Sequence, residues 1–363
     1  MNSRIAAVDG WRVVAAMGVL YSHAWTLMNF PSLKIGPVDM LQVMNLWGSG
    51  VHLFFVISGF CFYLVLSRQK DYTFGAALKF WSKRWLRLAP AFYVACLIYA
   101  SVNYALFRQD FFYRLFFNFI FFQNEVPNAE IQAIYWSLAV EWHFYLLLPL
   151  IFWQLRRSGI TKTIVAILII HITLNLLHYK GLLLPGDGWD YTIFANLGHF
   201  AWGILMGYFY VERKQFAFFN HPLSIIAGLG IAYAGKMLFY SHVVSALQGA
   251  GFIAKTVGPL IMTMGFACMI YSTLNNNALS KIFGARYIAA LGTITYSFYL
   301  WHNFILYLIY DQVSANIPKT ALGLALLLLM VLTILIPVSL VSYRLFESFY
   351  FKPRKLAINA SRT

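Results

Sequence analysis

The sequence predicts an all-α polytopic membrane protein of about ten transmembrane helices, with both termini in the cytoplasm. Three observations support this fold class: the composition, the spacing of long apolar stretches and the uneven distribution of Lys and Arg between loops. Of 363 residues, 61% are hydrophobic and 11% are charged, whereas a soluble domain carries about 25% charged residues. A chain with so few charges is expected to lie in a bilayer.

Apolar stretches long enough to cross a membrane recur along the whole chain. A span needs about 20 mostly apolar residues, and that length gives ten candidates, centred near residues 20, 57, 98, 144, 171, 202, 231, 264, 298 and 332. The first stretch is long and no small-x-small cleavage site follows it at once, so we expect it to be retained rather than removed as a signal peptide. Residues 111–122, FFYRLFFNFIFF, are too short to cross and are expected to lie in the interface or to re-enter.

Basic residues set the predicted orientation. About 20 of the 27 Lys and Arg fall in the termini and in every second loop, the pattern typical of cytoplasmic segments. No loop is long enough to fold separately, so we expect one membrane-embedded domain over residues 1–363, with a cytoplasmic tail from about residue 344.

Other functional classes are disfavoured by what the sequence contains. The formal net charge of +15 is explained by basic cytoplasmic loops, and no polar basic domain points to nucleic acid. Cys61, Cys96 and Cys268 each lie in an apolar stretch and predict neither a disulfide framework nor a zinc site. We therefore expect no bound metal.

Arg12 and His23 are polar residues in the first apolar stretch. Eleven residues of helix turn through about 1100° and rise about 16 Å, so the two side chains share a face at different depths. An imidazole titrates near neutral pH and can take a proton from a hydroxyl group. His23 is therefore a candidate base, although a buried packing role is also open.

Glu141 is the single acid that falls about mid-span, because the other eleven lie in loops, in tails or at span ends. Ser137 and Tyr145 share its predicted helix face. A deep carboxylate needs a cationic or hydrogen-bonding partner, or it becomes neutral. Either a catalytic role or a hydrogen bond between helices fits this position.

Further histidines compete for a role in the membrane. His52, His199 and His302 lie in predicted spans, each in the middle or outer half, where any of them can orient a substrate. The remaining intramembrane or interfacial histidines look more like packing residues, namely His143, His171 and His178.

Arg84 and Arg87 stand one helical turn apart in a basic segment before Pro90. Their presence fits cytoplasmic topology and binding to anionic lipid. It also fits a phosphate site, because guanidinium groups make bidentate contacts to phosphate.

Five segments in order resemble the acyltransferase 3 family of membrane proteins. Arg12 and His23 match its Arg/Lys, ten residues, His pattern, and LFFVISGF matches its Phe-Phe-x-x-Ser-Gly motif. Arg84 and Arg87 match its Arg-x-x-Arg motif. The later matches are Trp136, Ser137, Leu138 and Glu141, followed by ITYSFYLWH with Tyr296, Tyr299 and His302.

This resemblance implies an O-acyltransferase of a bacterial inner membrane that uses acyl-CoA, most commonly acetyl-CoA, as the cytoplasmic donor. The implied acceptor is a hydroxyl of a carbohydrate, such as a surface polysaccharide, lipopolysaccharide or lipid-linked glycan. In this reading Arg12, Arg84 and Arg87 hold the coenzyme phosphates and His23 is the general base. Glu141 then polarises the imidazole or orients the acceptor hydroxyl. Oxyanion or acceptor-orienting roles fall to Ser58, Tyr296, Tyr299 and His302.

Several alternatives stay open. Some family members carry an extra span and a soluble esterase-like domain, whereas this chain ends shortly after its tenth predicted span. It is therefore expected to complete the transfer itself or to pass the acyl group to a separate protein. A small secreted metabolite such as a macrolide is a second acceptor class. A proton-coupled transporter explains intramembrane His and Glu but not the arginine pair.

Overall fold

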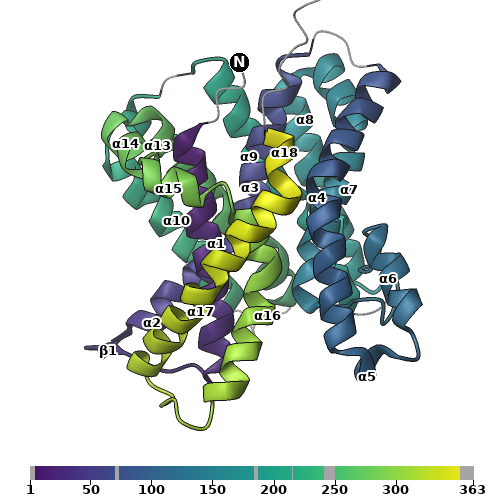
Figure 1. The fold of residues 1–363 in the computed structure, drawn as a ribbon. Helices are drawn as coiled ribbons and strands as arrows, with labels where there is room; N and C mark the ends of the chain where they lie inside the picture. Colours follow the sequence, from purple (N-terminus) through teal and green to yellow (C-terminus); the bar gives the residue numbers. More distant parts are fainter. Residues whose placement is uncertain (1–4, 70–72, 184–186, 215, 241–249, 352–363) are drawn as a thin grey trace, which may run out of the picture.

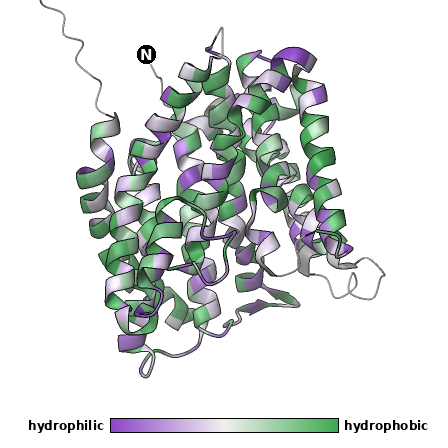
Figure 2. Cartoon of the chain, turned by 90° about the vertical axis from the view of Figure 1, so that its right-hand side faces the viewer, coloured by the Kyte–Doolittle hydropathy of each residue, from purple (hydrophilic) through white to green (hydrophobic). Residues whose placement is uncertain are grey.

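The computed structural model describes residues 5–69, 73–183, 187–214, 216–240 and 250–351. Almost all of its elements are helices, which stand side by side in one bundle (Figure 1). Hydrophobic residues make up most of the helical segments in view (Figure 2). Part of the predicted cytoplasmic tail, residues 352–363, lies outside the described residues.

The main helices account for every predicted span centre. Their bounds are α1 Ala6–Leu27, α3 Gly50–Leu66, α4 Phe74–Val102, α7 Trp136–Leu146, α8 Leu148–Tyr179, α9 Ile193–Val211, α10 Leu223–Tyr240, α13 Gly258–Asn275, α16 Thr295–Val313 and α17 Ala321–Ser342. α8 bends sharply at Gly159, whose φ of 77° is left-handed. The fourth predicted span is therefore α7 together with the first part of α8, and the fifth is the remainder of α8.

Shorter elements connect or extend these helices. They are β1 Lys34–Ile35, β2 Val38–Asp39, α2 Met40–Met44, η1 Asn45–Ser49, α5 Tyr104–Phe107, α6 Phe111–Phe119, η2 Ala133–Tyr135, η3 Asp187–Tyr191, η4 Ala217–Asn220, α12 Ala250–Phe252, η5 Ile253–Val257, α14 Asn277–Phe283, α15 Arg286–Leu291, η6 Tyr343–Glu347 and α18 Ser348–Phe351. β1 and β2 form an antiparallel hairpin. η5 and η6 are π-helical turns continuous with α13 and α17.

Length and composition identify five helical segments of the described chain that can cross a membrane. They are Met40–Leu66, Phe74–Val102, Leu148–Tyr179, Ile253–Asn275 and Ala321–Glu347. An all-α integral membrane architecture is thus confirmed, while the count of ten spans and the cytoplasmic orientation stay predictions. The start of α1 and the short α18 lie at one end of the bundle, and the β1–β2 hairpin lies at the other (Figure 1).

Helix starts follow local sequence chemistry. Thr73, Thr192 and Thr320 each precede a helix, and each side-chain oxygen accepts a hydrogen bond from a backbone N–H of the first turn. Such caps satisfy donors that the helix itself leaves unpaired. They set the starting points of α4, α9 and α17.

Helices α3 and α9 pack closely against each other, and two glycines make this contact possible. A Cβ atom on Gly59 would lie 2.2 Å from the carbonyl oxygen of Phe200, and one on Gly203 would lie 1.9 Å from that of Val56. Small residues allow membrane helices to approach at backbone distance. Because one face of α3 is pressed against α9, its other faces remain available to line a cavity.

Candidate active site

A cavity of about 1000 Å³ follows α3 along its length. Its α3 lining runs from Val51 to Leu64 and Val65, and Arg68 lines it just beyond the helix end. At a helix rise of about 1.5 Å per residue, the stretch from Val51 to Arg68 is about 25 Å long. This is most of the hydrocarbon thickness of a bilayer. The other walls come from α1, α4, α7, α16 and the turn before α16. The site residues that line this cavity are Arg12, Ser58, Arg84, Arg87, Glu141, Tyr296 and Tyr299.

Arginines gather at the end of the cavity nearer the start of α1. Arg12 donates to the Asp9 carboxylate at 2.5 Å and to the Cys61 sulfur at 3.2 Å. The Arg84 guanidinium lies 5.1 Å from the ring centroids of both Phe80 and Tyr145. The cation–π contacts and the ion pair hold these side chains toward the cavity. The structure thus brings the two predicted arginine motifs, Arg12 and the Arg84–Arg87 pair, to one place.

Asp9 is a functional neighbour that the sequence interpretation missed. Its side chain is 1% exposed and forms the ion pair with Arg12 one turn further along α1. The signal was present in the sequence, because an acid three residues before an arginine shares its helix face. Asp9 holds the Arg12 guanidinium at the cavity wall.

Glu141 joins two walls of the cavity midway along it. Its Oε1 atom accepts a hydrogen bond of 2.8 Å from the Ser58 hydroxyl of α3 and another from the Tyr145 hydroxyl of α7. Tyr145 is also held at its backbone, because the Trp81 indole donates to its carbonyl at 2.8 Å. The carboxylate thus has hydrogen-bonding partners, as a deep acid requires.

Hydroxyl groups of α16 line the same cavity. Tyr299 donates to the carbonyl of Ile134 at 2.7 Å and lies 2.7 Å from the Ser137 hydroxyl. Tyr296 donates to the carbonyl of Leu88 at 2.6 Å. A hydroxyl has one proton, so these tyrosines direct theirs to the backbone in this arrangement.

His23 lies beside His302 on the facing helix, with ring centroids 5.4 Å apart. The His302 ring is in turn 5.2 Å from the ring of Tyr299, which lines the cavity. Nδ1 of His302 lies 2.6 Å from the Tyr299 carbonyl oxygen. A carbonyl can only accept, so Nδ1 carries the proton and Nε2 of the neutral ring is an acceptor.

His23 and Glu141, predicted as possible partners, have different neighbours in the structure. Glu141 accepts from Ser58 and Tyr145, whereas the ring beside His23 is that of His302. Glu141 lines the cavity, whereas His23 and His302 are not among its lining residues and approach it behind Tyr299. Of the two roles considered for Glu141, orientation of a bound group fits these contacts better than polarisation of the imidazole.

Glu141 is not the most buried acid of the described chain, although it is the one that sequence position places mid-span. Asp9 and Glu347 are each 1% exposed and are more deeply buried than Glu141. Glu347 appeared to lie in a terminal tail, but η6 continues α17 and packs against α4, and the Ser297 hydroxyl of α16 donates to the Glu347 carboxylate. Sequence position alone does not show that such a helix end is covered.

His52, His171 and His199 form a separate cluster. The His199 ring lies 4.8 Å from His52 and 5.7 Å from His171, and its Nδ1 is 3.1 Å from the Thr263 hydroxyl. His143 lies 3.2 Å from the Glu125 carboxylate. Among the residues with described positions, no three His, Cys, Asp or Glu side chains are arranged to hold a metal ion.

The fold and cavity together define an integral membrane protein with a cation-lined internal site. Comparison with known proteins identifies its family. Residues 5–342 match the family described as an acyltransferase domain, so the chain belongs to this acyltransferase family.

Named relatives agree with an acyltransferase activity. The peptidoglycan O-acetyltransferase OatA of Listeria monocytogenes is 29% identical over 332 residues, covering 82% of this chain and 49% of that protein. A protein of Staphylococcus aureus strain COL, provisionally named O-acetyltransferase SACOL0978, is 25% identical, covering 86% of this chain and 53% of that protein. A protein of Acidianus two-tailed virus, provisionally named acetyltransferase ORF330, is 23% identical over 83% of this chain and 82% of its own length.

The chain spans about half the length of the Listeria and Staphylococcus relatives. No solved structure matches it significantly. The family match resolves the choice between enzyme and transporter in favour of an acyltransferase.

Proposed function

We propose that this chain transfers an acyl group, acetyl in the first instance, from acyl-CoA to a hydroxyl of a carbohydrate acceptor at a bacterial inner membrane. The observation that carries the proposal is the cavity along α3, with arginines at one end and the His23–His302 pair beside its Tyr299 wall. The glycan acceptor is supported by the name of the Listeria relative, a peptidoglycan O-acetyltransferase.

The arginine end suits the charged part of the donor. Guanidinium groups bind phosphate through charge-assisted, often bidentate, hydrogen bonds. In the proposal Arg12, Arg84 and Arg87 hold the coenzyme phosphates, and the pantetheine arm extends along α3. The apolar lining of α3 beyond the arginines, including Phe54 and Ile57, suits such a neutral chain.

The chemistry then takes place toward the opposite end. His23 accepts the proton of the acceptor hydroxyl, the oxygen attacks the thioester carbonyl, and the carbon–sulfur bond breaks. The proton completes the free thiol of the coenzyme, so atoms and charge balance. Glu141, through Ser58 and Tyr145, fixes the cavity wall past which the acyl group moves.

The test of this mechanism uses full-length protein in lipid nanodiscs with labelled acetyl-CoA and a glycan acceptor. A positioned general base contributes typically about 10² to 10⁴-fold to the rate, so His23→Ala is expected to lower acceptor labelling by at least about 100-fold. Donor binding is expected to persist, because the arginines are untouched.

His221→Ala is the matched control, since His221 is exposed and lies outside the cavity lining. It should label acceptor at the wild-type rate. Wild-type labelling by His23→Ala would eliminate the general-base assignment, and wild-type protein that transfers no acyl group would overturn the proposed function.

A further inference from the structure

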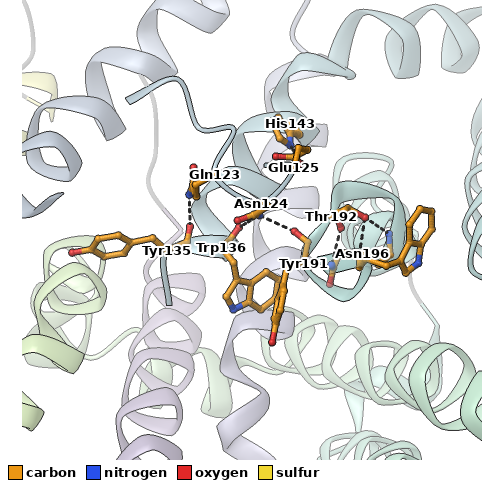
Figure 3. A network of polar contacts seen from close by, with 11 residues as sticks. Gln123, Asn124, Glu125, Tyr135, Trp136, His143, Tyr191, Thr192 and Asn196 are labelled. Atoms are coloured by element: carbon orange, nitrogen blue, oxygen red, sulfur yellow. Dashed lines mark hydrogen bonds and ion pairs between the residues drawn. The ribbon is translucent and has the colours of Figure 1, made fainter. Parts of the chain in front are cut away.

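Two aromatic side chains meet at the end of the bundle opposite the arginines. Trp136 begins α7, and Tyr191 ends η3, directly before the Thr192 cap of α9. Their ring centroids are 5.3 Å apart, and the ring planes are inclined by 53°. Figure 3 shows the two rings side by side, both directed away from the polar contacts of the connecting loops. Tyr191 is 46% exposed and Trp136 is partly exposed.

One amide holds this aromatic pair in place. The Asn124 side-chain nitrogen donates to the backbone carbonyl of Trp136 at 2.8 Å and to that of Tyr191 at 2.7 Å. Gln123 donates to the neighbouring Tyr135 carbonyl at 3.1 Å (Figure 3). The Asn124 side chain therefore links the start of α7 to the end of η3, which are far apart in the sequence. The pair is preorganised, which lowers the entropic cost of binding a ligand.

The pair adjoins the cavity. The Trp136 ring lies 6.0 Å from the ring of Phe55, and both Phe55 and Ser137, the residue after Trp136, line the cavity wall. A ligand on these rings would lie next to the passage described for the acyl group. The donor phosphates, in contrast, belong to the far end.

The chemistry of the pair suits a sugar. A pyranose ring has an apolar C–H face and a rim of hydroxyl groups, so it binds where an aromatic face is flanked by hydrogen-bonding groups. Next to Tyr191, the exposed Asp190 carboxylate accepts from Lys255 at 2.8 Å. Both groups can exchange that contact for hydroxyl groups of a ligand at little cost, since exposed ion pairs contribute little.

We propose that Trp136 and Tyr191 form an acceptor subsite that binds a sugar ring by its C–H face. This inference rests on the proposed function and deepens it by placing the acceptor. Aromatic side chains at a membrane surface also contact lipid head groups. The carbohydrate is favoured because the two rings lie together beside the cavity wall and Asn124 holds the backbone of both residues there.

The experiment measures binding of a defined probe, the tetramer of β-1,4-linked N-acetylglucosamine, to full-length protein in nanodiscs by saturation-transfer NMR. Wild-type protein is expected to bind it saturably, and Tyr191→Ala is expected to raise the Kd about tenfold. Tyr191→Phe, which keeps the ring, should restore binding. Acetyl-CoA affinity should be the same in all variants.

Tyr179→Ala is the matched control, because Tyr179 ends α8 and is 48% exposed. It should bind the tetramer as the wild type does. The proposal is overturned if wild-type protein shows no saturable binding up to about 10 mM, if Tyr191→Ala binds equally well, or if Tyr191→Ala changes only the affinity for lipid vesicles. Wild-type protein that binds the tetramer but transfers no acyl group would contradict the proposed function and leave the subsite standing.

Discussion

At the scale of single residues, several polar side chains at or near the cavity already donate their proton to a protein acceptor. Ser58 directs its proton to Glu141, and Tyr296 directs its proton to the carbonyl of Leu88. His302 carries its proton on Nδ1, beside the Tyr299 carbonyl. A developing oxyanion needs a donor aimed at it, so an oxyanion role for Ser58 or Tyr296 requires that residue to exchange partners when substrate binds. The arginines need no such exchange, because each guanidinium has five N–H groups.

Arg84→Lys tests whether donor binding needs the planar guanidinium group of Arg84 or only its positive charge. Lysine keeps the positive charge but loses the planar fork and the contacts over the Phe80 and Tyr145 rings. Loss of one charge-assisted hydrogen bond costs about 1.5–3 kcal/mol, so we expect the KM for acetyl-CoA to rise about tenfold or more, with kcat changed much less.

Steady-state kinetics with varied acetyl-CoA check this expectation. Lys83→Ala is the control, because Lys83 is the adjacent exposed basic residue and does not line the cavity. An equal rise in KM for both variants would show a general effect of surface charge instead of a specific phosphate contact.

Sequence reasoning reached these residues to different degrees. Residue type and mid-span position were enough to single out Glu141, whereas the family resemblance was needed to group Arg12 with the Arg84 pair and to add Ser58. The sequence could not predict that His302 lies beside His23, because their proximity depends on how α1 packs against α16. The burial of Glu347 was missed for the same reason, since it depends on a π-helical turn that returns a helix end to the bundle.

At the scale of elements, α3 is the helix on which the site depends. One face meets α9 at backbone distance through Gly59 and Gly203, and other residues line the cavity. A shift of α3 away from α9 would therefore narrow the cavity and move Ser58 relative to Glu141. The apolar stretch 50–66 indicated a buried span, whereas its central position follows only from packing.

Gly203→Ala tests this contact. The new Cβ atom would lie 1.9 Å from the Val56 carbonyl oxygen, so the helices must separate. Overpacking of this kind costs about 1–3 kcal/mol, and we expect a lower Tm in detergent together with reduced transfer.

Gly230→Ala in α10 is the matched substitution, because a Cβ atom there meets nothing within 4 Å. It should leave activity unchanged and leave Tm equal or slightly raised, since alanine is the better helix former by about 1 kcal/mol. Equal destabilisation by the two substitutions would show that the close approach of α3 and α9 is not what Gly203 provides.

At the scale of the whole molecule, the cavity extends along most of α3, in the direction between the two bundle ends that the loop charges predict to face opposite sides of the membrane. The basic loops could predict this polarity because charge asymmetry is a property of sequence alone. The path itself could not be predicted, because its walls come from five helices distant in sequence.

Labelling of Cys61 can show from which side of the membrane the cavity is accessible. It lines the cavity next to Arg12, whereas Cys96 is fully buried. A membrane-impermeant maleimide is therefore expected to label Cys61 in inverted vesicles, and acetyl-CoA is expected to slow the labelling by occupying the same space.

Cys61→Ser should remove this signal and reveal any background from Cys268, which is partly exposed. Labelling in right-side-out vesicles only, without protection by acetyl-CoA, would reverse the predicted orientation and remove the support for a cytoplasmic donor end.

The length of the cavity also has a consequence for the insulation of the membrane. A cavity that extends over about 25 Å, most of the thickness of a bilayer, is a route by which protons and cations can leak and dissipate the membrane potential. Fixed positive groups exclude cations from membrane pores, and Arg12, Arg84 and Arg87 line one end of this passage. The residues proposed to bind the donor phosphates are thus also expected to prevent cations from leaking through the enzyme when no donor is bound.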